Sequence, residues 1–171
     1  ALVSGLQGDL VLYEQIQKDL KRQRGIASLF VLGDLIGPQR NCNALLDRLR
    51  QPKPADLAPE CIYGWWEEQL LAESGYRGDR KADNLRQQQG DDGVNQLLAA
   101  VDSSHLKWLA SLQFGFIELD CALIHGSSAD VGDQLTEERS PLFLLDRLTG
   151  LDVNRLFTAR SHRQFRVELT G

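Results

Sequence analysis

The stretch Leu29-Phe30-Val31-Leu32-Gly33-Asp34-Leu35-Ile36-Gly37 carries the strongest fold signal in this chain. Its four leading apolar residues are typical of a strand that is buried on both faces, as in a parallel sheet. The strand then stops at an aspartate between two glycines. Open α/β proteins place their binding and catalytic groups at the carboxyl ends of their strands. Asp34 is therefore the first candidate functional residue.

Strand-like and helix-like segments alternate around this stretch. We expect a strand at residues 1–4 and a helix at 10–24, for which Asp9 is a suitable N-cap. A short helix is expected at 43–50 and a further strand at 60–63. Strands that alternate with helices indicate parallel strands joined by right-handed crossovers.

The second half of the chain begins with a polar, glycine-containing segment at 74–93, which predicts a solvated loop or a loosely packed helix. We see neither an internal repeat nor a linker, so residues 1–171 are expected to form a single domain. The elements expected after this segment are helices at 94–101 and 104–112, a hairpin of 116–119 and 122–125, a helix at 140–150, and strands at 156–159 and 165–169.

Composition excludes several classes of protein. The net charge is -5 over 171 residues and the pI is about 5.2, which argues against a general nucleic-acid binder. Apolar runs are too short to span a membrane, and the N-terminus shows no signal-peptide pattern. The three cysteines, Cys42, Cys61 and Cys121, contain no C-x-x-C pair and indicate reduced thiols. We therefore expect a cytoplasmic protein.

Five segments of the chain follow one another in an order and spacing that resemble a known superfamily. The calcineurin-like metallophosphoesterases carry the signature D-x-H, G-D, G-N-H-[DE], a strand ending in H-G, and G-H-x-H. The corresponding segments here are 1–9, 29–37, 62–67, 123–128 and 158–162. The resemblance implies an α/β fold, a four-layer α/β/β/α sandwich of two packed mixed sheets. It leaves open whether the second sheet is complete, because the chain stops at Gly171, soon after the fifth segment.

The resemblance also implies a site in which two divalent metal ions activate a water molecule for attack on phosphorus. Asp34 matches the aspartate that bridges the two metals, and His125 and His162 each match one histidine ligand. Gly5 and Gln7 stand where the family has the aspartate and histidine of the first motif. The metal ligands that remain are therefore Asp34, His125 and His162.

The other motif positions are occupied by residues that do not bind metals. Trp65 and Trp66 replace the asparagine and the leaving-group histidine of the third motif, and Arg160 replaces the first histidine of the fifth. Each metal would keep two protein ligands, whereas hydrolytic sites usually have about three, unless Gln7, Asp9 or Glu67 contributes. We expect no cofactor, with a single divalent ion (Mn, Zn, Ni or Fe) as the alternative.

Several of these residues have more than one interpretation. Asp34 either binds a metal or caps backbone amides, and Trp65 and Trp66 either fill the former metal cavity or form a partner surface. We expect Arg160 to form a salt bridge with Asp34 in place of the missing metal. A metal-free anion site is the other possibility, formed by Arg160 and Arg163 with backbone amides near Gly8, Gly126 and Ser127.

The sequence therefore favours a catalytically degenerate metallophosphoesterase-like protein that works as a binding or regulatory module and not as an enzyme. One alternative is a weak phosphoesterase with one metal ion, and another is a metal-free binder of a phosphorylated small molecule. The expected partners are a protein or a small phosphorylated ligand. A homo-oligomer is left open.

Overall fold

The computed structural model describes residues 1–38, 40–78 and 82–169, which form two three-stranded sheets and six helices. The strands are β1 (Leu2–Val3), β2 (Leu29–Leu32), β3 (Pro59–Ile62), β4 (Gly115–Glu118), β5 (Cys121–Ile124) and β6 (Arg155–Phe157). The helices are α1 (Leu10–Arg22), α2 (Asn43–Arg50), α3 (Trp65–Glu73), α4 (Asp83–Ala99), α5 (Ser103–Ser111) and α6 (Pro141–Thr149).

The first sheet has the order β1-β2-β3 and is parallel, with Leu2 opposite Phe30 and Val31 opposite Cys61. The expected helix crossovers are confirmed. In the second sheet β4 and β5 form the predicted antiparallel hairpin, and β6 pairs with β5 in parallel. Two mixed sheets were expected, but only the second is mixed. Helical crossovers connect the described strands of the first sheet, so none of them reverses direction.

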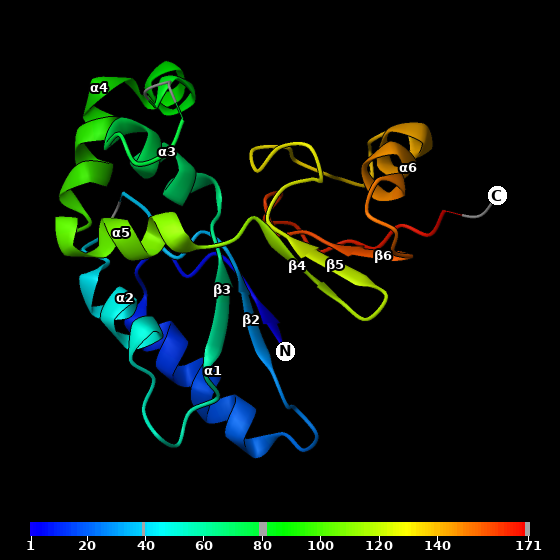
Figure 1. Ribbon diagram of the computed structural model, residues 1–171, viewed down its shortest axis with the longest axis horizontal. Coiled ribbons are helices and arrows are strands. Elements are labelled where there is room, and N and C mark those ends of the chain that lie inside the picture. The colour runs from blue at the N-terminus through cyan, green and yellow to red at the C-terminus, as the bar shows by residue number, and fades with distance from the viewer. Residues whose placement is uncertain (39, 79–81, 170–171) are drawn as a thin grey trace.

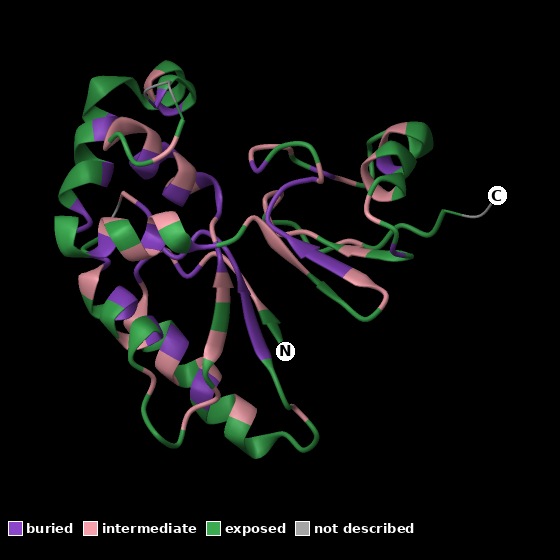
Figure 2. Cartoon of the chain, viewed as in Figure 1, coloured by how far each residue is buried: buried purple, intermediate pink, exposed green. Residues whose placement is uncertain are grey.

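Strand β2 is buried on both faces, as its sequence predicts (Figure 2). Leu29 and Val31 belong to the core that the helices cover, whereas Phe30 and Leu32 face the second sheet. The ring of Phe30 lies 5.6 Å from the ring of Phe116 on β4. Alternate residues of one strand therefore hold the two sheets and the helices together.

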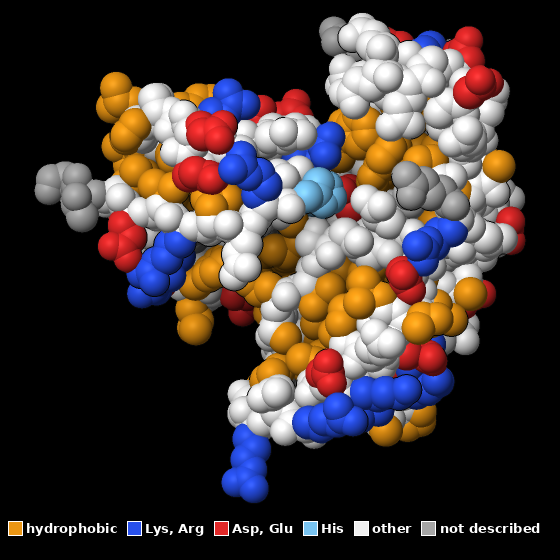
Figure 3. Space-filling view, turned by 180° about the vertical axis from the view of Figure 1, so that it is seen from behind, with side chains coloured by type: hydrophobic (Ala, Val, Ile, Leu, Met, Phe, Trp, Pro, Cys, Tyr) orange, Lys and Arg blue, Asp and Glu red, His pale blue; other side chains and the backbone are white. Residues whose placement is uncertain are grey.

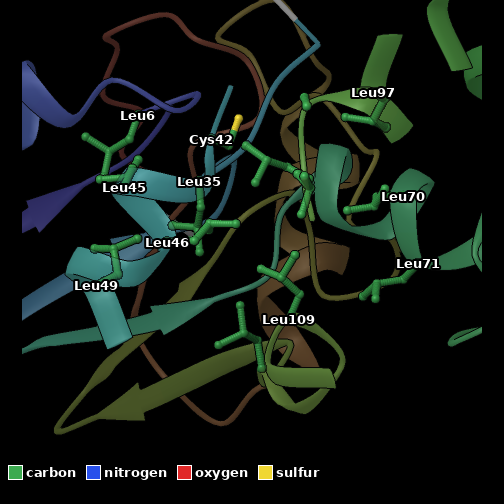
Figure 4. Close-up of a cluster of buried hydrophobic side chains, with 14 of the residues drawn as sticks. Leu6, Leu35, Cys42, Leu45, Leu46, Leu49, Leu70, Leu71, Leu97 and Leu109 are labelled. Carbon is green, nitrogen blue, oxygen red and sulfur yellow. The ribbon is translucent and has the colours of Figure 1, made fainter. Parts of the chain in front are cut away.

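The helices lie on opposite sides of the pair of sheets. In Figure 1, α1 to α5 lie beside the first sheet, and α6 lies beyond the second. The main core fills the space between the first sheet and its helices, and Figure 4 shows leucines of several elements pointing toward one another there. The described helices include none that is long and apolar enough to cross a membrane.

Two helices differ from the sequence predictions. Helix α3 was not predicted. It begins at Trp65, directly after β3, where the consecutive tryptophans gave no helical period. Helix α4 covers most of the polar segment and bends at Gly90, whose φ of 70° is not helical. Its buried residues are few, so the pattern is weak. Residues 79–81 of that segment lie outside the described part.

The prediction of a strand at residues 165–169 is wrong. Its residues alternate between apolar and polar, but they pair with no described strand. They instead line a groove of about 880 Å³ beside α6 and β6. The apolar Val167 and Leu169 are exposed, so the alternation does not mark a buried face here. A strand also needs a neighbour for its backbone hydrogen bonds.

Candidate functional site

Three of the family-like segments meet at the carboxyl end of the first sheet. The backbone N–H groups of Gly5 and Gln7 donate to the carbonyls of Gly33 and Asp34, at 3.2 and 3.0 Å. Gly33 has a φ of +73°, and a Cβ added there would lie 2.5 Å from the Cα of Gly64. Only glycine permits this approach. The loops that follow β1, β2 and β3 are therefore held against one another.

Glu67 joins two of these loops from inside the protein. Its buried carboxyl group accepts hydrogen bonds from the N–H groups of Asp34 (2.9 Å), Ile36 (2.9 Å) and Gly64 (2.6 Å). Burial and the nearby Asp34 carboxylate raise the pKa of Glu67 to about 8, against the effect of the three donors. Glu67 is thus a structural residue, and its oxygens are not free to bind a metal.

Asp34 lies at the centre of the site and is fully buried. Its Oδ1 accepts a hydrogen bond from the N–H of Trp66 in the first turn of α3, at 3.2 Å. The Nε2 atoms of His125 and His162 lie 3.3 Å from Oδ1 and 3.4 Å from Oδ2. Burial alone would raise the pKa of Asp34, but the adjacent His162 and the N–H of Trp66 outweigh it and lower the pKa. Asp34 is therefore ionised, and it caps a helix.

His125 is held in one tautomer by the strand next to it. Its Nδ1 lies 2.7 Å from the carbonyl oxygen of Leu32 and donates to it, which leaves Nε2 with a lone pair. Burial lowers the pKa of His125, so the ring stays neutral. That lone pair faces the Asp34 carboxylate. Within the part of the chain that the structure describes, both His125 Nε2 and Asp34 Oδ2 are buried without a hydrogen-bond partner. Such unpaired buried atoms are rare and suit a bound cation.

The backbone is strained at this site. Gln7, Asp34 and His162 have φ values of 44°, 51° and 51°, a region that residues other than glycine rarely adopt. All three stand at family-motif positions. Strained residues concentrate at binding and catalytic sites, where the surrounding structure holds them in place.

Arg160 does not form the expected salt bridge with Asp34. Its guanidinium carbon lies 4.5 Å from the ring centroid of Trp65, and Asp34 is not among its ion-pair partners within the described residues. Its backbone N–H donates to the carbonyl of His125 at 2.8 Å, which holds the backbone of Arg160 beside the site. The face of an indole attracts a guanidinium. Arg160 therefore stacks on Trp65, and it interacts with Asp34 only through the electrostatic field of its charge.

The two tryptophans have different environments. Trp65 is only 3% exposed, so it is not part of a partner surface and instead fills the space beside Arg160. Trp66 is half-buried, and its ring meets that of Trp65 edge-on at 4.7 Å. The side chain of His162 is 44% exposed. In Figure 3 a histidine reaches the surface where the two halves of the molecule meet.

Two parts of the proposed anion site are already engaged. Arg163 pairs with Glu137 at 3.0 Å and with Glu138 at 3.3 Å. The N–H groups of Gly8 and Ser127 donate to the carbonyls of Leu35 and Asp130. An anion would have to displace these partners, so Arg160 remains the more available of the two arginines.

The family's two-metal centre does not fit these residues. Among the described residues, no group of three or more His, Cys, Asp or Glu side chains is arranged to hold a metal ion. Of the extra ligands considered, Asp9 caps α1 and pairs with Arg40, and Gln7 packs against Gly37. The potential ligands that remain are Asp34 Oδ1 with His125 Nε2 on one side of the carboxylate, and Asp34 Oδ2 with His162 Nε2 on the other.

No protein-family model and no curated protein matches this chain. A solved structure does: the crystal structure of a metallophosphoesterase from Sphaerobacter thermophilus, with a TM-score of 0.61 and 16% sequence identity. The match covers 94% of this chain and 59% of that one, so the chain spans less than two thirds of its structural neighbour. The α/β fold is therefore metallophosphoesterase-like, as the motif order predicts.

Sequence reasoning placed Asp34, His125 and His162 as candidate ligands, and the structure brings them together. The sequence did not predict the structural role of Glu67, which connects the loops that follow β2 and β3 through hydrogen bonds. A signal was present: an acidic residue three positions after Gly64 is typical of the first turn of a helix, where it binds free N–H groups.

Proposed function

We propose that this chain is a catalytically degenerate metallophosphoesterase-like domain that acts as a binding or regulatory module through the former active-site face. The observation that carries the proposal is the Arg160–Trp65 stack beside Asp34, since a fixed cation and an indole stand where metal ligands are expected. A guanidinium cannot give up its charge and cannot bind a metal. We also propose that the sheets and flanking helices make up the four layers of the family sandwich.

The chemistry of the site supports this proposal in a second way. Trp66 replaces the histidine that assists the leaving group, and an indole transfers no proton at neutral pH. Half-buried Trp66 and exposed His162 give the face side chains with which a partner could interact. A protein partner, a homo-oligomer and a cytoplasmic location stay predictions.

A weak phosphoesterase with one metal ion is the second candidate. Asp34 Oδ2 and His125 Nε2 favour it, since they have no hydrogen-bond partner in the described ranges and a cation between carboxylate and imidazole would satisfy both atoms. When bound, the ion would polarise a phosphate oxygen or a water molecule. Imidazole nitrogens with a carboxylate suit Zn, Ni, Mn or Fe better than Mg or Ca.

Metal content separates the two candidates. The protein would be purified without chelator and examined by elemental analysis, and its melting temperature would be measured with added Mn²⁺ or Zn²⁺. A degenerate domain should hold far less than one ion per chain and show no shift that Asp34→Asn abolishes. A full equivalent of metal, lost in Asp34→Asn, would support the second candidate instead.

A further inference from the structure

Arg160 is held beside the site by two independent contacts. Its backbone N–H donates to the carbonyl of His125, and its guanidinium lies on the ring of Trp65, which itself packs near Gly132. The Nε of Arg160 is buried and has no hydrogen-bond partner among the described residues. The side chain is therefore fixed by stacking and not by an ion pair.

The charge of Arg160 acts on the carboxylate that could bind a metal. Burial lowers the pKa of Arg160, and the Asp34 carboxylate opposes that effect. Trp65, on whose ring the guanidinium lies, is followed by Trp66, whose N–H donates to the Asp34 carboxylate at 3.2 Å. A positive charge that interacts with the carboxylate competes with any second cation for it.

We propose that Arg160, seated on Trp65, is a resident cation that takes the place of one of the family's two metal ions and limits the site to one ion at most. This inference rests on the proposed function, which explains why such a replacement is tolerated. Trp65 contributes because an indole face binds a cation without offering a lone pair to a metal. Arg160 thus determines the metal stoichiometry of the site.

The test compares wild-type protein with Arg160→His, Arg160→Gln and the matched control Arg163→His. Arg163 directly follows the fifth segment, but it pairs with Glu137 and Glu138 on the surface, so its replacement adds a histidine away from Asp34. Each chelator-treated protein would be titrated with Zn²⁺ and with Mn²⁺ by calorimetry. Circular dichroism would confirm that each variant is folded.

We expect Arg160→His to bind Zn²⁺ at least about tenfold more tightly than wild type, since changes around a metal site alone alter affinity by that factor or more. Arg160→Gln should bind more tightly by a smaller factor, because it only removes the charge. Arg163→His should behave as wild type. Wild type should bind fewer than two ions per chain.

Two results would overturn the inference: two ions bound by wild type with Arg160 in place, or equal affinities in wild type, Arg160→His and Arg160→Gln. The wild-type stoichiometry decides the question even if a variant fails to fold. Catalysis is judged separately. Phosphodiester turnover by a protein with one ion would contradict the proposed function and leave the role of Arg160 intact.

Discussion

Nε2 of His125 lies 3.3 Å from Oδ1 of Asp34, although the other ring nitrogen already donates to the carbonyl of Leu32. Two electron-rich atoms therefore face each other inside the protein. The N–H of Trp66 gives Oδ1 one hydrogen bond. This arrangement explains why the site can be described either as a capped helix or as half of a metal centre.

The cap that Asp34 provides for α3 should be measurable. Asp34→Ala removes the acceptor for the Trp66 N–H, and loss of such a cap typically costs about 0.5–2 kcal/mol in the free energy of unfolding. Asp34→Asn keeps an oxygen at this position and should cost less. Urea unfolding of chelator-treated proteins at pH 7 checks the order. Equal stabilities of wild type and Asp34→Ala would show that the hydrogen bond contributes nothing.

The charge of Asp34 predicts an acid-dependent difference. Its pKa is lowered in the folded protein, so the carboxylate stabilises the fold above its ordinary pKa of 3.8, and that stabilisation is lost as the pH falls through the lowered value. Asp34→Asn should therefore be less stable than wild type at pH 6, and the gap should close in acid. Melting temperatures from pH 2 to 6 test this. If the difference in melting temperature between wild type and Asp34→Asn widened in acid, the pKa of Asp34 would be raised in the folded protein and not lowered.

The raised pKa of Glu67 predicts the opposite trend, in which the stability of the protein falls as the pH rises. Its pKa rises from an ordinary 4.5 to about 8 on folding, so the folded state holds a proton that the unfolded state has lost. Its contribution is fully present below pH 4.5 and disappears as the pH rises to about 8. Glu67→Gln should show a flatter stability profile over this range, measured by denaturant unfolding. An unchanged slope would mean that the three N–H donors keep Glu67 ionised.

Arg160 should stabilise the protein through Trp65. A cation–π contact of this kind is worth about 0.5–2 kcal/mol, so Arg160→Ala should lower the free energy of unfolding by that amount. Arg163→Ala, which removes exposed ion pairs, should cost at most about 1 kcal/mol. Tryptophan fluorescence should also change in Arg160→Ala only. Identical spectra and stabilities would indicate that the stack does not form in solution.

Cys61 should resist alkylation. Burial raises its pKa to about 12. At pH 8 its thiolate fraction, and with it the reaction rate, should be about a thousandfold below that of a thiol with the ordinary value of 9.0. Iodoacetamide labelling followed by peptide mass spectrometry measures the rate, with urea-unfolded protein as the control. Rapid labelling in native protein would mean that the thiol is accessible.

Much of the fold was predictable because its signals are local. The apolar run before Asp34, the Asp9 cap of α1 and the Ser140-Pro141 start of α6 each specify an element without distant partners. The strand predicted at 165–169 failed because pairing depends on a neighbour that its own sequence does not contain. Helix α3 was missed because its consecutive tryptophans gave no helical period, although Glu67, three residues after Gly64, marks a helix start.

The site was predictable only as far as the motif order reaches. That order brought Asp34, His125 and His162 together, but it could not show which partner Arg160 would choose. Charge alone favoured Asp34, whereas the structure places the flat guanidinium on the indole of Trp65. Side-chain packing, which no motif records, decided between them.

Manganese-dependent hydrolysis of a chromogenic phosphodiester is the measurement that tests the degenerate site most directly. Wild type, Asp34→Asn and His125→Asn would be assayed at equal concentration with saturating Mn²⁺. We expect all three to match the protein-free Mn²⁺ control. Turnover by wild type that depends on Mn²⁺ and disappears in both variants would contradict this and show that the site still catalyses phosphodiester cleavage.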